Sequence, residues 1–327
     1  MDLKTLHVGY EPSNQAHWTG RTSSPDIDAQ YWHEAITLLN IKDMAEKKTD
    51  IALIGYACEE GVKRNLGRIG AAEGPNAIRE RLAKLPIHFD SAKIADFGNI
   101  SCLDRDMETC QLGLAHTITE MLSHGIFPIA IGGGHDMSYG HFKGIYNAVQ
   151  GDTDKKIGII NFDAHFDLRP IEEVSNSGTP FHQILHEFDH VTYFAIGIQQ
   201  QSNTKALFDI AKNKLVHYAM NDACDASKEE LEALKERLHP FIDSCDYLYI
   251  TIDLDGFSSS YAPGVSAPSP LGFTPRFVFK TLDFLLNSKK IISCDLAEMN
   301  PRFDRDNTTA NLAARLIDYI VTHKDKH

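Results

Sequence analysis

The chain has 327 residues, of which 43% are hydrophobic and 24% are charged, a composition typical of a globular protein that buries a large core. Its formal net charge of −13 argues against non-specific binding to nucleic acid, which requires a basic face. No apolar run approaches the roughly 20 residues of a membrane span, so we expect no membrane-spanning segment.

The N-terminus and the cysteines favour a cytoplasmic protein. The first ten residues, MDLKTLHVGY, lack the basic and apolar regions of a signal peptide. The six cysteines form no CxxC pair; they are Cys58, Cys102, Cys110, Cys224, Cys245 and Cys294. In a chain of this size we expect them to be reduced core residues, and we therefore predict a cytoplasmic location.

From residue 50 onward, short apolar runs typical of buried strands alternate with stretches typical of helices. Strands are predicted at 50–55, 93–97, 127–131, 156–162, 191–196, 247–252 and 291–294. Helices are predicted at 75–85, 107–124, 138–148, 227–238, 275–286 and 307–322. This alternation predicts an α/β protein with three layers, α/β/α, around one doubly wound and mostly parallel sheet.

No linker, repeat or change of composition divides the chain. We therefore expect a single α/β domain over residues 50–327. Residues 1–49 show no regular pattern, and we expect them to form an irregular N-terminal segment packed on that domain. The sequence leaves the role of this segment open.

Three short clusters of acidic residues and histidines follow three of the predicted strands. They are Gly132-Gly133-Gly134-His135-Asp136, Asp163-Ala164-His165-Phe166-Asp167 and Asp253-Leu254-Asp255. Side chains on alternate residues of an extended segment point the same way, so each of the last two clusters can direct its polar groups at one spot. In an open parallel sheet, ligands bind outside the carboxyl ends of the strands, where the three clusters are expected to meet.

The number and chemistry of these side chains predict a site for two metal ions. Six candidate ligands are too many for one catalytic zinc ion, which usually takes three protein ligands. They suit two divalent ions that share bridging carboxylates. Oxygen and imidazole donors without thiolates favour Mn²⁺ or a similar ion over structural zinc, while zinc, iron and cobalt remain alternatives.

The clusters resemble the three metal-binding signatures of the ureohydrolases, a family that includes arginases, agmatinases and formimidoylglutamases. The resemblance involves residues 132–135, 163–167 and 251–255 and extends from residue 50 to the end of the chain. The finer pattern is most similar to the formimidoylglutamase branch, in the stretches 67–79, 161–169, 177–181 and 262–268 and in Gly134. It implies an arginase-like fold and hydrolysis of the formimino C–N bond of N-formimidoyl-L-glutamate to L-glutamate and formamide, a step of histidine degradation.

The resemblance also implies two Mn²⁺ ions per subunit. One would be held by His135, Asp163, Asp167 and Asp253, and the other by Asp163, His165, Asp253 and Asp255. Asp163 and Asp253 would bridge the two ions. A hydroxide formed from water between the ions would attack the planar carbon of the substrate, and the tetrahedral intermediate would then expel an amine.

Three residues are candidates for work on the reacting group. Glu298 matches the substrate-binding glutamate of the family and would face the cationic amidinium. Asp167, or another metal-bound acid, would pass the proton of the attacking water to the leaving nitrogen. His182 is a candidate general acid, although it comes five residues after Ser177, where agmatinases have the histidine of their His-Gly-Thr sequence.

Three more residues are candidates for binding the rest of the substrate. Arg169 comes two residues after Asp167, and its guanidinium would hold a carboxylate of the substrate in a bidentate fork. Ser177 lies where arginases use a serine to contact substrate. Asn203 follows the predicted strand 191–196 and would either contact substrate or cap a helix.

Other functions remain open at this point. The nearest is another ureohydrolase that releases urea from a guanidino substrate, namely an agmatinase, a guanidinobutyrase or an arginase, although Arg169 would repel the cationic tail of agmatine. An arginase-fold deacetylase would hold one zinc ion, an inactive scaffold would lack ligands, and a two-metal phosphatase would need a phosphate-binding loop. The resemblance further implies a homo-oligomer that acts on a small amidine or guanidino compound, with neither nucleic acid nor membrane as a partner.

Overall fold

The computed structural model describes residues 6–24, 30–149 and 154–325. Within these ranges ten strands form one sheet in the order β1-β4-β3-β5-β10-β9-β6-β7-β8, with β2 beside β4. The strands are β1 Gly9–Glu11, β2 Thr37–Leu38, β3 Ile51–Ala57, β4 Ile94–Ser101, β5 Phe127–Ile131, β6 Ile157–Phe162, β7 Val191–Ile198, β8 His217–Met220, β9 Tyr247–Asp253 and β10 Ile291–Ala297. Among the described strands, β1 pairs antiparallel with β4, and every other pairing is parallel.

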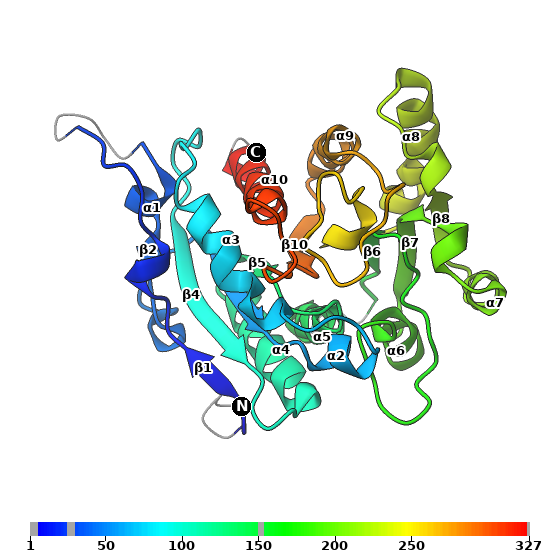
Figure 1. Ribbon diagram of the computed structural model, residues 1–327, viewed down its shortest axis with the longest axis horizontal. Coiled ribbons are helices and arrows are strands. Elements are labelled where there is room, and N and C mark those ends of the chain that lie inside the picture. Colours follow the sequence, from blue (N-terminus) through cyan, green and yellow to red (C-terminus); the bar gives the residue numbers. More distant parts are fainter. Residues whose placement is uncertain (1–5, 25–29, 150–153, 326–327) are drawn as a thin grey trace.

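Helices cover both faces of this sheet, which gives the three predicted layers (Figure 1). One face carries α3 Gly74–Leu82, α8 Lys228–Asp243, α9 Pro275–Leu286 and α10 Thr308–Asp325. The other face carries α4 Met107–Ser123, α5 Met137–Val149, α6 Pro180–Glu187 and α7 Lys205–Asn213. Two shorter helices are α1 Trp32–Ala35 and α2 Glu60–Arg64.

The central strands are apolar on both sides because each side faces a separate hydrophobic core. In β5, Ile129 and Ile131 enter the core under α9 and α10, and Ala130 enters the core under α4 and α5. All five residues of β5 are buried. A strand covered on both faces reads as a continuous apolar run, which is why the pattern of the sequence predicts a parallel sheet.

The seven predicted strands and six predicted helices are all present, with ends shifted by a few residues. The prediction omitted β1, β2 and β8 and the helices α1, α2, α6 and α7. Strands of two to four residues carry no readable alternation, and α2 and α6 lie inside stretches that look like loops.

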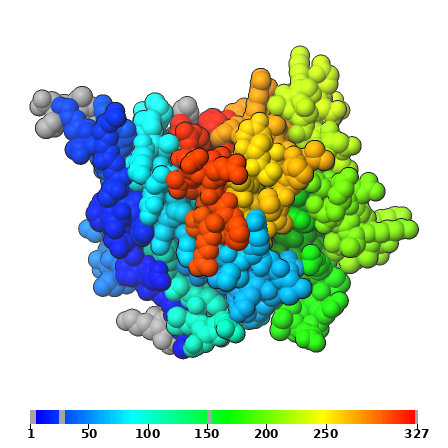
Figure 2. Space-filling model, viewed as in Figure 1, coloured from blue at the N-terminus to red at the C-terminus, as the bar shows by residue number. Residues whose placement is uncertain are grey.

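The described part of residues 1–49 contributes to this sheet and to its core. Strands β1 and β2 both pair with β4, and Figure 2 shows the N-terminal residues in dark blue along that flank of the molecule. Trp18 and Trp32 are buried, and each indole donates to a carboxylate of the rest of the chain, Asp96 at 2.9 Å and Asp318 at 2.7 Å. Across the described residues, no helix combines the length and the hydropathy that a membrane crossing requires.

Candidate metal centre

Four neighbouring strands at the middle of the sheet, β5, β10, β9 and β6, bring the predicted residues to one edge. His135 follows β5 across three glycines, and Asp163 follows β6 directly. Asp253 is the last residue of β9, and Glu298 follows β10 directly. Because these strands are parallel, all four side chains leave the sheet at its carboxyl edge, as the sequence predicts.

The turn after β5 requires its glycines. Gly132 and Gly133 both have a backbone φ of +75°, in the left-handed region that glycine adopts without strain. A Cβ on Gly132 would lie 2.4 Å from Pro75, and one on Gly133 would lie 2.4 Å from the carbonyl oxygen of Tyr56. The two glycines therefore let the chain turn sharply and place His135 beside the strands.

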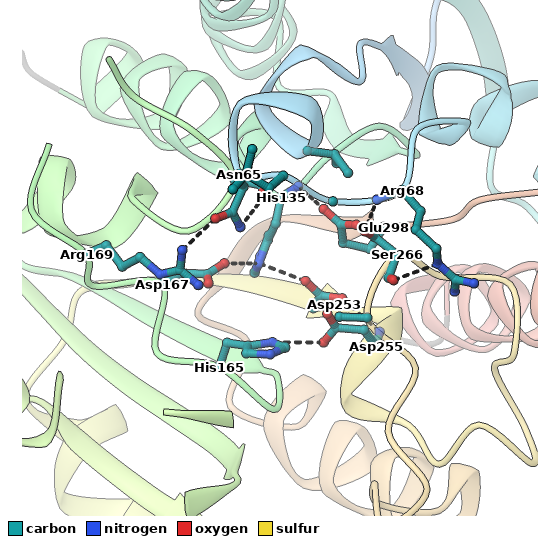
Figure 3. A pocket seen from close by; sticks show the side chains of 15 residues that line it. Asn65, Arg68, His135, His165, Asp167, Arg169, Asp253, Asp255, Ser266 and Glu298 are labelled. Carbon is teal, nitrogen blue, oxygen red and sulfur yellow. Dashed lines mark hydrogen bonds and ion pairs between the residues drawn. The ribbon is translucent and has the colours of Figure 1, made fainter. Parts of the chain in front are cut away.

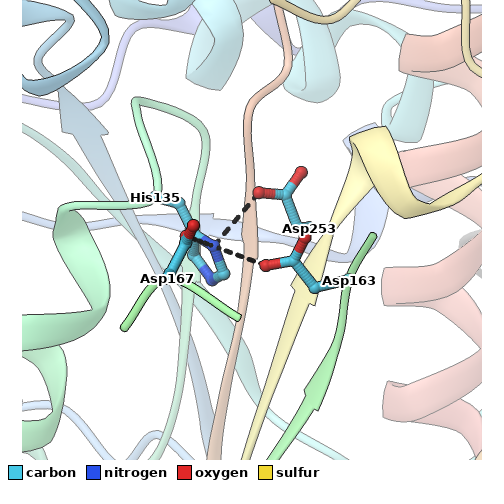
Figure 4. A group of neighbouring side chains, drawn as sticks. All are labelled: His135, Asp163, Asp167 and Asp253. Carbon is cyan, nitrogen blue, oxygen red and sulfur yellow. Dashed lines mark hydrogen bonds and ion pairs between the residues drawn. The ribbon is translucent and has the colours of Figure 1, made fainter. Parts of the chain in front are cut away.

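The first group of converging side chains is His135, Asp163, Asp167 and Asp253, whose ligand atoms all lie within 4.8 Å of one another (Figure 4). Nδ1 of His135 lies 2.9 Å from Asp167, 3.1 Å from Asp253 and 3.2 Å from Asp163. One imidazole nitrogen carries at most one proton and cannot donate to three carboxylates at once. One nitrogen among three carboxylate oxygens is a donor set that fits a shared cation.

The second group is Asp163, His165 and Asp255. Nδ1 of His165 lies 3.3 Å from an oxygen of Asp163 and 3.3 Å from Oδ1 of Asp255. That Asp255 oxygen is buried and accepts no hydrogen bond, which is costly unless a cation lies beside it. Asp163 belongs to both groups, in the position of a bridging carboxylate, whereas Asp253 joins the first group alone.

The outer oxygens of the shared carboxylates are held by the protein. Asp163 accepts from the Nδ2 of Asn161 at 3.0 Å and from the backbone N–H of His165 at 2.7 Å. Asp253 accepts from the backbone N–H of Asp255 at 2.8 Å, within the 3-10 turn Leu254–Gly256. Such support fixes the direction of a metal ligand before the ion binds.

The electrostatics of the cluster also favour a cation. Burial, reinforced by repulsion from Asp163, raises the pKa of Asp167 to about 6. Burial and repulsion from Asp253 raise the pKa of Asp255 well above its usual value. Burial opposes ionisation of Asp163, but hydrogen bonds from His135 and His165 outweigh it and lower the pKa of that carboxyl. A divalent cation would remove this repulsion, so the residues present fit a site for metal ions.

Glu298 lies beside the cluster without belonging to either group. It is 4% exposed, and its Oε1 accepts from the backbone N–H of His135 at 2.9 Å. Burial and the nearby Asp253 raise the pKa of Glu298 well above its usual value. A buried carboxyl that resists ionisation is suited to a cationic partner in the adjoining cavity.

A cavity of about 310 Å³ opens over this cluster (Figure 3). Its walls include the following polar residues: Asn65, Arg68, His135, His165, Asp167, Arg169, Ser177, Asp253, Asp255, Ser266 and Glu298. Figure 3 shows the guanidinium groups of Arg169 and Arg68 on opposite sides of the converging acids. The cavity therefore combines an acidic floor with two cationic groups in its walls.

Arg169 and Ser177, both predicted to bind substrate, meet through a residue that the prediction omitted. Nη1 of Arg169 donates to Oδ1 of Asn65 at 2.6 Å, and Nδ2 of Asn65 donates to Ser177 at 3.0 Å. Asn65 ends α2 and comes just before the stretch 67–79 that resembles the family, but no pattern in the sequence marks it. A contact across 104 residues of chain becomes visible only in the folded structure.

Arg68 is a second omitted residue of the cavity wall. Its guanidinium donates to the carbonyls of Ser266 at 2.9 Å and of Val265, and it lies 3.9 Å from the ring centre of Phe303. Carbonyls and an aromatic face hold the group without neutralising it. Its positive charge therefore remains available to the cavity.

His182 and Asn203 do not line this cavity. His182 is on α6, where its ring stacks on His186, and burial lowers its pKa. The preceding residue, Phe181, packs edge-on against His135 at 5.4 Å. Asn203 is buried and directs its side chain at backbone groups, accepting from Phe166 and donating to Ala164. Asn203 thus holds the loop of the second cluster in place.

The parallel α/β fold and the converging acids define the class of protein. Residues 49–322 match the model of the Arginase family, and the chain belongs to this family.

Two relatives that match nearly the whole chain carry the same name. The chain is 40% identical to a formimidoylglutamase of Geobacillus kaustophilus (strain HTA426) over 318 residues, which cover 96% of this chain and 97% of the relative. It is also 40% identical to a formimidoylglutamase of Clostridium tetani (strain Massachusetts / E88) over 328 residues, 97% of this chain and 96% of the relative.

Solved structures share the fold. Formimidoylglutamase from Bacillus subtilis superposes with a TM-score of 0.81 at 24% identity, over 92% of this chain and 94% of that chain. Trypanosoma cruzi formiminoglutamase, solved with Mn²⁺, superposes with a TM-score of 0.77 at 24% identity, over 88% of this chain and 99% of that chain. The predicted arginase-like α/β fold is thereby confirmed.

Proposed function

We propose that this protein is a formimidoylglutamase, a hydrolase that converts N-formimidoyl-L-glutamate and water to L-glutamate and formamide. The observation that carries the proposal is the 40% identity, over nearly the full length of both chains, to relatives named for this activity. The two guanidinium groups in the cavity wall fit a substrate with two carboxylates.

The two groups of ligands fit two Mn²⁺ ions. His135, Asp163, Asp167 and Asp253 would hold one ion, and Asp163, His165 and Asp255 the other, with Asp253 as a further bridge. Bound ions of this kind lower the pKa of water and so supply the nucleophile near neutral pH. The T. cruzi formiminoglutamase was crystallised with the same metal.

The residues of the chain orient the substrate and move its protons. Glu298, at the cavity floor, would pair with the amidinium and hold the planar carbon beside the metal-binding groups. Asp167 lines the same cavity and would accept a proton from the attacking water and give it to the leaving nitrogen. The bond between the formimino carbon and the α-nitrogen of glutamate would then break. That nitrogen leaves as the amine of L-glutamate, and the formimino carbon leaves as formamide, with its other nitrogen and the oxygen of the water.

The far end of the substrate would lie between the two arginines. Arg169, held by Asn65, would take one carboxylate in a bidentate contact, and Ser177 would donate to the same group. We assign Asn203 a role in positioning the ligand loop, and we assign no step to His182, because neither residue lines the cavity.

The proposal also covers the cellular location and the oligomeric state of the protein. All six cysteines are free and five of them are buried, which suits the reducing cytoplasm. We propose a cytoplasmic homo-oligomer, as the resemblance to ureohydrolases implies. Light scattering of the purified protein measures the oligomeric state. A mass in solution of 36.5 kDa, that of one chain, would reject the homo-oligomer.

The test is turnover by Mn²⁺-loaded protein on N-formimidoyl-L-glutamate, agmatine, arginine and 4-guanidinobutyrate, with formamide and urea measured separately. Protein stripped of metal by a chelator is the matched control. We expect formamide from N-formimidoyl-L-glutamate, and no urea from the other three compounds. Urea from any guanidino substrate, without formamide, would overturn the proposal and leave a ureohydrolase of another branch.

A further inference from the structure

Arg68 in the cavity wall is held by neutral groups. Among the described residues that line the cavity, Arg68 and Arg169 alone carry a permanent positive charge. Arg302, on a neighbouring loop, pairs with Glu73 at 2.6 Å. Arg68 instead contacts two backbone carbonyls and an aromatic ring, none of which carries a charge. Its guanidinium therefore keeps its full charge for a ligand in the cavity.

Hydrogen bonds to two other loops fix the backbone of Arg68. Its N–H donates to Oγ of Ser266 at 2.9 Å, and its carbonyl accepts from Nδ2 of Asn300 at 2.9 Å. Ser266 belongs to the loop that follows Asp255, and Asn300 comes two residues after Glu298. Arg68 is thereby placed relative to the groups that would hold the reacting end of the substrate.

The guanidinium of Arg68 is oriented before any substrate binds. Nε donates to the carbonyl of Ser266 at 2.9 Å and Nη2 to the carbonyl of Val265 at 2.5 Å, which occupies one edge of the planar group. The ring of Phe303 covers one face, with its centre 3.9 Å from Cζ. These contacts leave the outer edge, made of Nη1 and the second N–H of Nη2, which is a fork that fits a carboxylate. A side chain held in advance loses little further freedom when an anion binds.

The two arginines of the cavity differ in depth. Arg68 is half-buried, whereas Arg169 is exposed, and they lie on opposite sides of the acids (Figure 3). In N-formimidoyl-L-glutamate, only the nitrogen and the α-carbon separate the α-carboxylate from the formimino carbon, and the side-chain carboxylate lies two methylene groups further away. The more buried arginine therefore fits the carboxylate nearer to the reacting carbon, and the exposed arginine fits the carboxylate at the far end.

We propose that Arg68 binds the α-carboxylate of N-formimidoyl-L-glutamate through the outer edge of its guanidinium, and that Arg169 binds the side-chain carboxylate. The inference rests on the proposed function and specifies its substrate class. With the amidinium at Glu298, the substrate is held at three points. The enzyme then selects formimidoyl derivatives of α-amino acids that have an acidic side chain, and it discriminates against compounds that lack either carboxylate.

Two amide analogues of the substrate, each without one negative charge, separate the two arginines. N-formimidoyl-L-isoglutamine is neutral at the α-position, and N-formimidoyl-L-glutamine is neutral at the side chain. The unaltered protein should prefer N-formimidoyl-L-glutamate to each analogue by about 10-fold or more in kcat/KM, because each amide leaves one guanidinium without its carboxylate. Arg68→Met should lose the preference over N-formimidoyl-L-isoglutamine and keep the preference over N-formimidoyl-L-glutamine. Arg169→Met should show the reverse.

Arg302→Met is the matched control, because it removes the same charge from a residue that pairs with Glu73 and does not line the cavity. It should keep both preferences and the kcat/KM of the unaltered protein. Bound Mn²⁺ and the melting temperature of each variant report an intact site and fold. If Arg68→Met folds poorly, Arg68→Lys keeps the charge without the fork and should lose part of the preference at the α-position alone.

The possible outcomes separate this inference from the proposed function. If Arg68→Met forms formamide and keeps its full preference over N-formimidoyl-L-isoglutamine, the inference is overturned and the proposed function stands. Loss of the preference over N-formimidoyl-L-glutamine in its place would assign Arg68 to the side-chain carboxylate and would also overturn the inference. No formamide from the unaltered protein would reject the proposed function, and the inference would fall with it.

Discussion

At the scale of single residues, two acids of the site hold an unfavourable backbone conformation. Asp167 has a φ of +48° and Glu298 a φ of +66°, the left-handed region that costs a residue with a side chain roughly 1–3 kcal/mol. Both are fixed by neighbours: the backbone N–H of Glu298 donates to Gly133 at 2.8 Å, and the carbonyl of Asp167 accepts from Phe181 at 3.2 Å. In this conformation both residues line the cavity.

Arg169 is the residue through which substrate specificity can be tested. Arg169→Ala would remove the proposed charge-assisted bidentate contact with a carboxylate of the substrate. Such a contact contributes roughly 1.5–3 kcal/mol, so we expect KM for N-formimidoyl-L-glutamate to rise about 10- to 100-fold. Because the contact is distant from the reacting carbon, kcat should change little. Steady-state kinetics measure both constants, with bound Mn²⁺ determined as the control for an intact site. Arg169→Lys, which keeps the charge without the fork, should give a smaller rise, and an unchanged KM in Arg169→Ala would reject this residue as the anchor.

A variant of Asp253 tests the proposed site for two metal ions. Asp253→Asn removes one negative charge from the carboxylate at the end of β9 while preserving its size. We expect bound Mn²⁺ to fall below two ions per chain and turnover to drop by more than about 100-fold, beyond the cost typical of residues that only support ligands. Elemental analysis of the purified variant gives the metal content. Full activity with full metal content would refute the two-metal mechanism.

The sequence predicts residues of the site where acids and histidines lie close together in short motifs. The five acids and histidines at 163–167 and 253–255 are marked by their alternation and by the strands before them. Asn65, Arg68 and Ser266 are not marked, because each reaches the cavity from a loop whose position depends on contacts across 100 residues or more.

At the scale of elements, the predicted and omitted parts differ in their periodicity. Strands such as β5 and β9 are five to seven residues long and apolar on both faces, and they were predicted within a residue of their ends. Strand β1 has three residues and β2 has two, too few to reveal a period of two. Their place in the sheet is decided by pairing with β4, a tertiary contact that no local pattern encodes.

The helix α1 in the N-terminal segment has a pH-sensitive cap. Oxygens of the Glu34 carboxylate accept from the backbone and hydroxyl of Ser23 and from the backbone N–H groups of Gln30 and Tyr31. These bonds, those from Ser23 first, lower the pKa of Glu34 from 4.5 to about 2. A depressed folded pKa gives stability that is present above pH 4.5 and is lost as the pH falls towards 2.

We therefore expect Glu34→Gln to melt at a lower temperature than the unaltered protein at pH 6, and the gap to close progressively below pH 4.5. Thermal melts between pH 6 and pH 3 follow the gap. Glu46→Gln, at an exposed acid of the same segment, serves as the matched control and should show little effect at any pH. A gap for Glu34→Gln that does not change with pH would contradict the role of its charge.

At the scale of the whole molecule, the metal site ties together the centre of the sheet. The proposed ligands follow β5, β6 and β9, so bound ions would link three of the four central strands and neutralise acids buried between the two helical layers. Ions that bind the folded chain alone stabilise it, by about 2.7 kcal/mol for each site when the free ion is at 100 times its Kd. For two sites in a chain of this length, that corresponds to a rise of roughly 5–10 °C in Tm. Calorimetry of chelator-stripped protein with and without added Mn²⁺ should show this rise, and Asp253→Asn should lose most of it. A Tm of the unaltered protein that does not respond to Mn²⁺ would mean that the converging acids are not a metal site, because an ion bound among them must stabilise the folded chain.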